Sequence, residues 1–300
     1  MTVTSSNFNN IAKAISAYAQ AERTDAALLT STALVGSDAR ITDAGENYTG
    51  TLRWLDFADP STAYKQSETI ADTNINLMSA SNKSAIYVKN IDHIGAQEAS
   101  IQKLVSKVDG LSYLGSQFAA VRARREDLQL RSILNGVSDK IWGATAIEYE
   151  EAFYYLVVDT STYNIMRKQN VLDVAPVVDG NFSFNTIMGG KIRLVINNQV
   201  LTANMPAGLK VSYLAKPAAF HYSEIGQVNP TAVDRNELAG NGGGAVTILS
   251  RWGNIMHPKG FSWAGSATAY PANIDLADAA SWSVHATNVN QMGIFPIFHG

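Results

Sequence analysis

The segment from Ile255 to Gly265 places several side chains that could do chemistry within eleven residues. It reads IMHPKGFSWAG and contains His257, Lys259 and Ser262 together with two aromatic residues. Histidine, lysine and serine are residue types that serve as bases and nucleophiles in active sites. The same residues could equally form a wall of a larger assembly. The choice between these two interpretations depends on the rest of the chain.

The histidines give no support to a metal site. None of them has the H-x-x-x-H or H-E-x-x-H spacing of a zinc enzyme, and they are His93, His221, His257, His285 and His299. Cysteine is absent, which excludes disulfides, thiolate catalysis and cysteine metal ligands. We therefore expect surface histidines or hydrogen-bonded core histidines, and neither a metal nor a cofactor.

Three carboxylates near the middle of the chain form a second candidate group. Glu148, Glu150 and Glu151 lie in EYEEAF, directly before an apolar run. Two carboxylates can act as general acid and base, but their separation in space cannot be read from neighbouring positions. Acidic residues in front of a strand usually form a solvated segment. A metal-independent hydrolase that uses one of them with His221 or His257 is the least favoured alternative.

The glycine-rich segment Gly240–Ala245 could suggest a phosphate-binding loop. Such a loop opens a helix and carries a lysine followed by Ser or Thr, whereas GNGGGA precedes a strand-like run and has no such lysine. No G-x-S-x-G nucleophile motif occurs in the chain. We therefore predict a flexible surface loop here. The motif search as a whole predicts no catalytic residue and no enzyme activity.

Charge is sparse in this chain of 300 residues. Charged residues make up 16%, against about 25% in typical soluble proteins, while hydrophobic residues make up 46%. Because few groups can solvate a free surface, part of the surface is expected to lie against other protein. The net charge of −3 and a pI near 6.0 do not mark a nucleic-acid or membrane binder. With no signal-peptide pattern and no apolar run long enough to span a bilayer, we expect a soluble intracellular protein.

Two projecting segments are predicted in the first third of the chain. Residues 1–35 carry apolar residues at helical spacing, which predicts a short helical arm that is too small to fold alone. Residues 45–92 hold strand-like runs at Leu52–Phe57 and Ser84–Val88 around a long polar connection, the pattern of an extended β-hairpin. The connection has too little apolar surface to form a core, so we expect the hairpin to dock on a neighbour.

Residues 95–137 contain the clearest helix pattern. An apolar stripe runs along it, and Asn135-Gly136 is expected to end the helix; the stripe consists of Leu111, Leu114, Phe118, Val121, Leu128 and Leu134. The basic run RARRED, Arg122 to Asp127, lies across the polar side. Its favoured interpretation is a solvated face with ion pairs to Glu126 and Asp127. A face toward a neighbour's acidic residues or toward packaged nucleic acid is the alternative.

Residues 145–300 alternate between strand-like and helix-like runs. We predict a buried strand at Tyr154–Val158 with a helix after it, and a second buried strand in which Ile192, Leu194 and Ile196 alternate. Further strand-like runs lie in KVSYLAKPAAFHYSE and in AVTILSRWGNIMHPKGFSW, which leads into a loop. Short strands mixed with helices indicate an α+β fold, and no repeat or clear linker divides the chain.

Four segments, taken in their order along the chain, carry a resemblance to a known family. They are Gly110–Val137, similar to a long spine helix; Val157–Asp173, similar to the strand and helix that begin an axial domain; Ile187–Val200, similar to a strand before a variable loop; and the late series MHPKGFSWAG, PANIDLADAASW and NQMGIFPIFHG. Together they resemble the major capsid proteins of tailed bacteriophages, which have the Hong Kong 97-type fold.

The resemblance implies an α+β phage major-capsid fold with five regions. These are an N-terminal arm (1–44), an extended hairpin loop (45–92), a peripheral domain with the spine helix (93–145), an axial domain (146–250) and a C-terminal return to both domains (251–300). It also implies that His257 and Lys259 line a structural turn, and that Phe261 and Trp263 pack into the domain that joins the hairpin to the spine. No catalytic role is implied.

The function that the resemblance implies is self-assembly. Identical subunits would form hexamers and pentamers that close into an icosahedral shell around the double-stranded DNA of a tailed phage. This places the protein in the virion, after assembly in the host bacterial cytoplasm. The implied partners are portal, scaffolding and cement or decoration proteins, and DNA at the inner face, where Arg122, Arg124 and Arg125 are the candidate contacts. The alternative is an encapsulin-like nanocompartment, which has the same fold and a protein cargo.

Some members of the family crosslink a hairpin lysine to an asparagine of a neighbouring subunit. Lys65 lies in the polar connection of the predicted hairpin. Lysine and asparagine are too common in this chain for the sequence to support such a crosslink.

Overall fold

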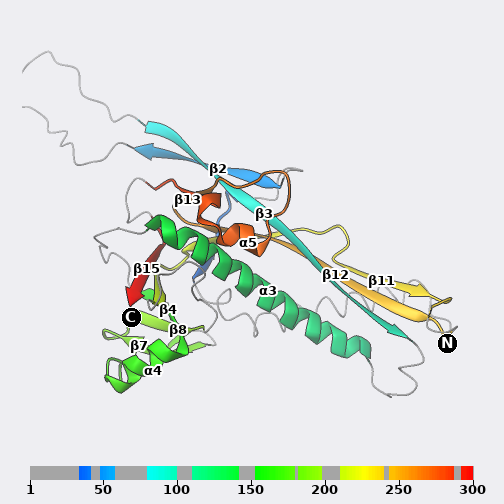
Figure 1. Ribbon diagram of the computed structural model, residues 1–300, viewed down its shortest axis with the longest axis horizontal. Helices are drawn as coiled ribbons and strands as arrows, with labels where there is room; N and C mark the ends of the chain where they lie inside the picture. The colour runs from blue at the N-terminus through cyan, green and yellow to red at the C-terminus, as the bar shows by residue number, and fades with distance from the viewer. Residues whose placement is uncertain are drawn as a thin grey trace, which may run out of the picture.

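Two large β-sheets and one long helix form the main part of the fold (Figure 1), and two two-stranded sheets accompany them. The computed structural model describes residues 34–41, 48–57, 80–99, 110–141, 153–179, 182–197, 210–239, 243–286 and 292–299. Helix α3 (Gly110–Ile141) runs alongside the long strands of the larger sheet, and the smaller sheet lies at one end of the molecule. The predicted α+β class is therefore confirmed. The predicted N-terminal helical arm lies almost entirely outside the described residues, and its last residue, Val35, begins a strand.

The larger sheet is built around two long antiparallel strands, β3 (Ala80–Ala99) and β12 (Ala245–Pro258). They pair from Lys89 opposite Ile255 to Ala99 opposite Ala245. The full strand order is β1 (Val35–Ser37), β10 (Phe220–Ile225), β12, β3, β2 (Thr49–Phe57), and β11 (Thr231–Asn236) pairs with the first half of β12. β1 joins β10 in parallel, and the other pairs of this sheet are antiparallel.

The predicted hairpin is confirmed by the pairing of β2 with β3. Thr49 lies opposite Val88 and Phe57 opposite Ala80. Both strands are longer than the sequence pattern, and β3 continues through residue 92 into the body of the subunit. The predicted boundary between hairpin loop and peripheral domain thus falls inside one continuous strand. The polar connection at 58–79, which includes Lys65, lies outside the described residues.

Helix α3 differs from its prediction at both ends. Residues 95–99 belong to β3 and not to the helix, and Asn135-Gly136 does not end it, because the helix continues to Ile141. Gly136 is needed for close packing. A Cβ atom there would lie 2.3 Å from the carbonyl oxygen of Leu276 and 2.7 Å from Nε1 of Trp282. The glycine therefore marks a contact within the helix, which the sequence alone does not distinguish from a C-terminal glycine.

The buried surface of α3 is wider than the predicted stripe. Phe118 and Leu134 are buried as expected, but Leu128 is 42% exposed. Small and polar residues on other sides of the helix are buried instead, including Ala123, Glu126 and Gln129. The stripe prediction was wrong in this respect because α3 has neighbours on more than one side: β3 and β12, and also helix α5 (Asn273–Ala277) and the 3-10 turn Ala279–Ser281. Leu111 and Leu114 have side chains outside the described set.

The smaller sheet has the strand order β15, β9, β4, β8, β7. Its strands are β4 (Tyr154–Val158), β7 (Thr186–Ile187), β8 (Ile192–Ile196), β9 (Lys210–Ala215) and β15 (Ile294–His299). β4 is buried along its whole length and pairs in parallel with β8, so both predicted strands are confirmed. The predicted helix after β4 is α4 (Thr160–Lys168), which Asp159 caps by accepting a hydrogen bond from the Thr162 amide at 2.8 Å. After α4, the chain forms a small antiparallel hairpin of β5 (Val177–Asp179) and β6 (Phe182–Phe184) before it enters β7.

Four short elements, β13 (Phe261–Trp263), α5, the 3-10 turn and β14 (Trp282–Val284), connect the last strand of the larger sheet to β15 of the smaller sheet. β13 pairs with β14, and the α5 segment between them packs on α3. β15 then returns the chain to the smaller sheet. Most buried apolar residues form one cluster that contains the second half of α3, β4, β9 and these C-terminal elements. Among the described helices, none combines the length and the hydropathy needed to cross a membrane.

Candidate functional site

The segment Ile255–Gly265 is a strand, a tight turn and a second strand. His257 belongs to β12 and is 2% exposed, so it does not line the turn as the sequence suggested. The turn itself consists of Lys259 and Gly260, where the glycine adopts a φ of 88°. A Cβ at Gly260 would also approach Met292 to 3.2 Å. Phe261, Ser262 and Trp263 follow in β13, and all three are buried, which agrees with the packing role predicted for the two aromatics.

This segment joins the hairpin to the C-terminal elements. The Ile86 amide of β3 donates a hydrogen bond to Oγ of Ser262 at 2.9 Å. Trp263 packs edge-to-face on Trp282 with ring centroids 5.1 Å apart, and Nε1 of Trp282 donates to the Leu276 carbonyl at 2.8 Å. Hairpin, β13 and the α5 segment are thereby tied to α3. The serine that looked like a candidate nucleophile is an acceptor in a structural contact.

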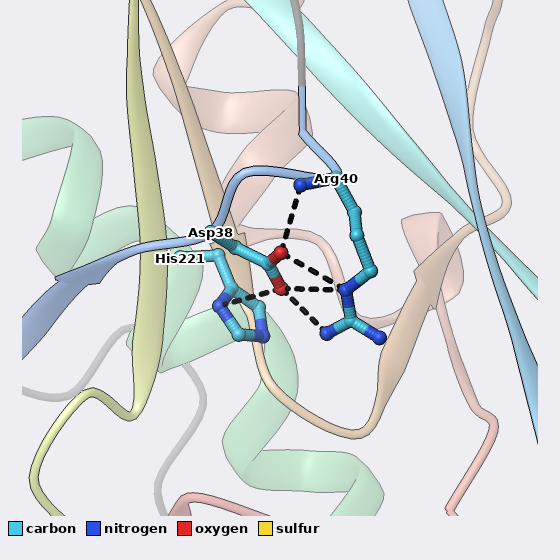
Figure 2. Close-up of polar contacts among 3 residues, drawn as sticks. All are labelled: Asp38, Arg40 and His221. Atoms are coloured by element: carbon cyan, nitrogen blue, oxygen red, sulfur yellow. Dashed lines mark hydrogen bonds and ion pairs between the residues drawn. The ribbon is translucent and has the colours of Figure 1, made fainter.

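His221 and His257 form the one imidazole pair of the described residues, on neighbouring strands. They lie opposite each other in β10 and β12, and their rings are stacked with centroids 6.5 Å apart and planes at 12°. Figure 2 shows that Asp38, in the segment after β1, lies between His221 and Arg40. Its carboxylate is 3.5 Å from Nδ1 of His221 and 2.6 Å from a guanidinium nitrogen of Arg40. Sequence reasoning missed Asp38 because it lies far from His221 in the chain.

The surroundings of His221 and His257 favour the neutral form of both side chains. The Arg40 side chain, which donates hydrogen bonds to the carboxylate, lowers the pKa of Asp38 to about 2. Burial lowers the pKa of His221, with Asp38 acting in the opposite direction. Burial, together with the positive charge that His221 carries when protonated, lowers the pKa of His257 from 6.5 to about 3. Both rings are therefore uncharged near neutral pH.

A carboxylate beside a histidine is also part of a hydrolase triad, but the third group is missing here. Within the described ranges, no hydrogen bond joins either ring to a serine or threonine hydroxyl, and Asp38 is the carboxylate that acts on both. His257 is instead hydrogen-bonded to the backbone of Phe261. The acidic residues of the hydrolase alternative, Glu148, Glu150 and Glu151, lie outside the described residues. The geometry gives that alternative no support.

The remaining histidines are dispersed, as expected. His93 is exposed on β3, His285 packs edge-to-face on Trp54 at 5.0 Å, and His299 hydrogen-bonds Oγ of Ser212 at 2.8 Å. In the part of the chain that the structure describes, no three His, Cys, Asp or Glu side chains come together as a metal site. The glycine-rich segment at 240–245 leads into β12, in agreement with its position before a strand; only its last three residues are described.

The arginines of RARRED do not form the solvated face that we predicted. Arg122 pairs with Glu126 at 3.0 Å, as the i,i+4 spacing suggested, but Glu126 is 1% exposed and Arg122 also reaches Glu224 of β10 at 2.9 Å. Arg125 pairs with Asp92 of β3 at 2.6 Å. Both guanidinium groups lie about 6 Å from the ring centroid of Trp252 (6.0 and 5.7 Å), within cation–π range. Arg122 and Arg125 thus attach the helix to the sheet. Arg124, in contrast, is exposed.

The Arg125→Gln substitution is expected to lower the free energy of unfolding by about 1–2 kcal/mol. It removes a partly exposed ion pair and a cation–π contact, each of which contributes up to about 1 kcal/mol. The Arg124→Gln substitution on the same turn is the control and should change stability by less than about 0.5 kcal/mol. Urea denaturation followed by far-UV circular dichroism measures both. Equal effects of the two substitutions would contradict the fastening role of Arg125.

The arrangement defines the class of fold. A long helix lies along an antiparallel sheet, a hairpin strand continues into that sheet, and a separate mixed sheet carries its own capping helix. This is an α+β fold of the kind found in tailed-phage capsid subunits.

The comparison with solved structures supports the assignment of the fold. A protein of the capsid of Ralstonia phage GP4 matches over 79% of this chain and 86% of its own, with a TM-score of 0.52 and 10% sequence identity. Matches to the Helicobacter pylori bacteriophage KHP30 capsid (TM-score 0.49, 9% identity, 89% of both chains) and to Microbacterium phage Oxtober96 (0.47, 12%, 88% and 89%) are weaker. We base the assignment on the Ralstonia phage protein, whose TM-score exceeds 0.5. No family model matches the sequence, and no curated protein matches it either.

Proposed function

We propose that this chain is a major capsid protein that assembles as hexamers and pentamers into an icosahedral shell around the double-stranded DNA of a tailed phage. The observation that carries the proposal is the shared fold, which extends over 79% of this chain and 86% of the Ralstonia phage capsid protein. The scarcity of charged residues, 16% of the chain, supports it, because a shell subunit buries much of its surface against neighbours. An enzyme role has no comparable support.

The finer features of the proposal follow from the same role. The location is the virion, with assembly in the host bacterial cytoplasm, and the partners are portal, scaffolding and cement proteins. The five regions, 1–44, 45–92, 93–145, 146–250 and 251–300, serve as arm, hairpin loop, peripheral domain, axial domain and C-terminal return. A shell needs heterologous contacts between identical subunits, and contacts that are weak singly become strong once a subunit is held in the lattice.

DNA contact is proposed for the inner face of the shell. Of the three candidate arginines, Arg122 and Arg125 already have carboxylate partners within the subunit, at 2.9 Å from Glu224 and 2.6 Å from Asp92. Their replacement is therefore expected to affect the subunit itself, and Arg124 is the cleaner probe. An Arg124→Gln capsid that packages a genome of normal length would exclude a contribution of this residue to DNA contact.

An encapsulin-like nanocompartment is the alternative function for the same fold. The two differ in cargo: a phage capsid holds nucleic acid and carries a portal, whereas a nanocompartment holds an enzyme. The Ralstonia phage structure that shares the fold comes from a phage capsid, which favours the first. Analysis of nucleic acid and protein that copurify with assembled particles distinguishes them.

Negative-stain electron microscopy of the purified recombinant protein, with a sedimentation profile, tests the proposal. Closed shells or rings of five and six subunits are expected, either for the chain alone or after coexpression with a scaffolding protein. A homogeneous monomer under both conditions, with no assembly at high salt concentration either, would contradict the capsid function.

A further inference from the structure

Residues 34–41, which we term the strap, cross the junction between the two main apolar clusters. Leu34 is fully buried in the larger cluster beside Phe220. Ile41 is 2% exposed in the smaller cluster under the hairpin, beside Leu52. Between these two ends, β1 adds only a three-residue parallel pairing to the edge of the sheet. The strap is therefore held by an apolar residue at each end and by a short, weak strand in the middle.

The polar contacts of the strap converge on the histidine pair. Asp38 reaches Nδ1 of His221 at 3.5 Å, and the ring of His221 is nearly parallel to that of His257, with the centroids 6.5 Å apart (Figure 2 shows the contact between Asp38 and His221). His221 is 8% exposed and His257 2% exposed. Nδ1 of His257 is buried without a hydrogen-bond partner. The more buried ring, that of His257, thus lies in a space that accommodates a neutral imidazole. If Nδ1 of His257 took up a proton, no acceptor would be in place for the new N–H group.

The charges around the pair are mostly positive. The strap contributes Asp38 and Arg40, and the turn after β12 contributes Lys259, which lowers the pKa of His221 together with Arg40. β3 contributes the ring of Tyr87, 6.5 Å from that of His257, and Lys89 is the next residue on the same side of that strand. His285, whose amide donates to the Gly260 carbonyl, turns its ring to Trp54 instead. Asp38 is the carboxylate facing the pair among the described residues, and its charge is shared with Arg40.

We propose that the strap is an acid-released latch, in which protonation of the buried His221–His257 pair detaches residues 34–41 from the sheet. A first proton on His221 is compensated by Asp38. A second proton on His257 adds a buried charge beside the first, with no further carboxylate to pair with it. Release of the strap lets water reach both rings. The inference concerns the subunit and stands independently of whether the subunits form a shell.

The direction of the pH effect follows from the histidines. Burial holds the pKa of His257 at about 3 with the strap in place, against 6.5 for an exposed histidine, and lowers that of His221 as well. A group whose pKa is lower in the closed state binds protons more readily in the open state. The closed strap is therefore fully favoured above about pH 6.5 and loses stability as the pH falls below it, and His257 alone increases the opening constant by up to about tenfold for each pH unit.

A spin label on the strap tests the latch. The chain contains no cysteine, so a Ser37→Cys substitution on the exposed residue of β1 gives a single attachment site. Electron paramagnetic resonance spectra between about pH 7.5 and about pH 4.5 report the mobile fraction of the label. We expect that fraction to rise about tenfold between about pH 6.5 and about pH 5.5 and to fall again on neutralisation. A label attached in a separate Ser283→Cys variant, at an exposed position of β14, should keep the same spectrum over this pH range.

Matched variants identify the group responsible. His257→Phe keeps an aromatic ring and removes the proton site, so the acid release should be lost or shifted by at least about one pH unit. His93→Gln changes an exposed histidine of β3 and should leave the transition unchanged. A Ser37 label that stays immobile at low pH in the otherwise unchanged chain would overturn the latch. So would simultaneous mobility at Ser283, which reports global unfolding, or an unchanged transition in His257→Phe.

Discussion

The Trp282→Ala substitution is expected to lower the free energy of unfolding by about 3–5 kcal/mol, the range for removing a large aromatic side chain from a core. Trp282 is 1% exposed and fills the space between the C-terminal elements and α3. Its ring packs edge-to-face on Trp263, and its Nε1 donates to the Leu276 carbonyl. The substitution removes apolar area, an aromatic pair and a hydrogen bond, and leaves a buried carbonyl without its donor.

The measurement is urea denaturation of the unassembled subunit, followed by far-UV circular dichroism because the substitution removes a fluorescent residue. Val284→Ala in the same short strand is the control, since that side chain is 40% exposed and its loss should cost less than about 1 kcal/mol. Equal losses in the two variants would mean that Trp282 does not anchor the C-terminal segment to the helix.

The Gly136→Ala substitution is expected to destabilise the subunit by about 2 kcal/mol, although alanine is the better helix former. Alanine in place of glycine inside a helix gains about 1 kcal/mol. The added Cβ would, however, lie 2.3 Å from the Leu276 carbonyl oxygen, a backbone atom that cannot rotate away. Overpacking of this kind typically costs about 1–3 kcal/mol and more where the backbone must move, so the clash outweighs the helix propensity.

Gly226→Ala is a suitable control for this prediction. A Cβ at Gly226 has no atom within 4 Å, and the residue does not have a positive φ. This substitution should leave the urea midpoint unchanged or raise it slightly, since it restricts the unfolded chain. A Gly136→Ala subunit as stable as the unsubstituted one would show that α3 and α5 can separate at no cost, in conflict with their close packing.

The elements that depend on local pattern were predictable from the sequence. The alternation in β8 and the apolar run of β4 gave the two strands of the smaller sheet, and the Thr and Ser residues after β4 marked the start of α4. The pairing of β2 with β3 as a hairpin also agrees with the pattern. In each case the neighbours along the chain determine the conformation, so a single sequence is enough.

Features that depend on distant neighbours were not predictable in the same way. Asn135-Gly136 has the composition of a helix end, and only the position of Leu276 shows that its glycine serves close packing. Glu126 looks like a solvated acid, yet it is buried because Arg122 and Tyr222 reach it from the helix and from β10. Asp38 gains its role from His221, which is far away in the chain. Tertiary contacts decide all three.

Strand β3 also has a mechanical consequence. It is one unbroken strand of 20 residues, about 65 Å long at about 3.3 Å per residue, which begins in the hairpin and ends opposite the first residue of β12. A pull on the hairpin along this axis loads the ladder between β3 and β12 in shear, so that many hydrogen bonds bear the force together and none is opened first. A sideways force would peel the same bonds one after another. The subunit is therefore stiff toward tension along the hairpin and compliant across it.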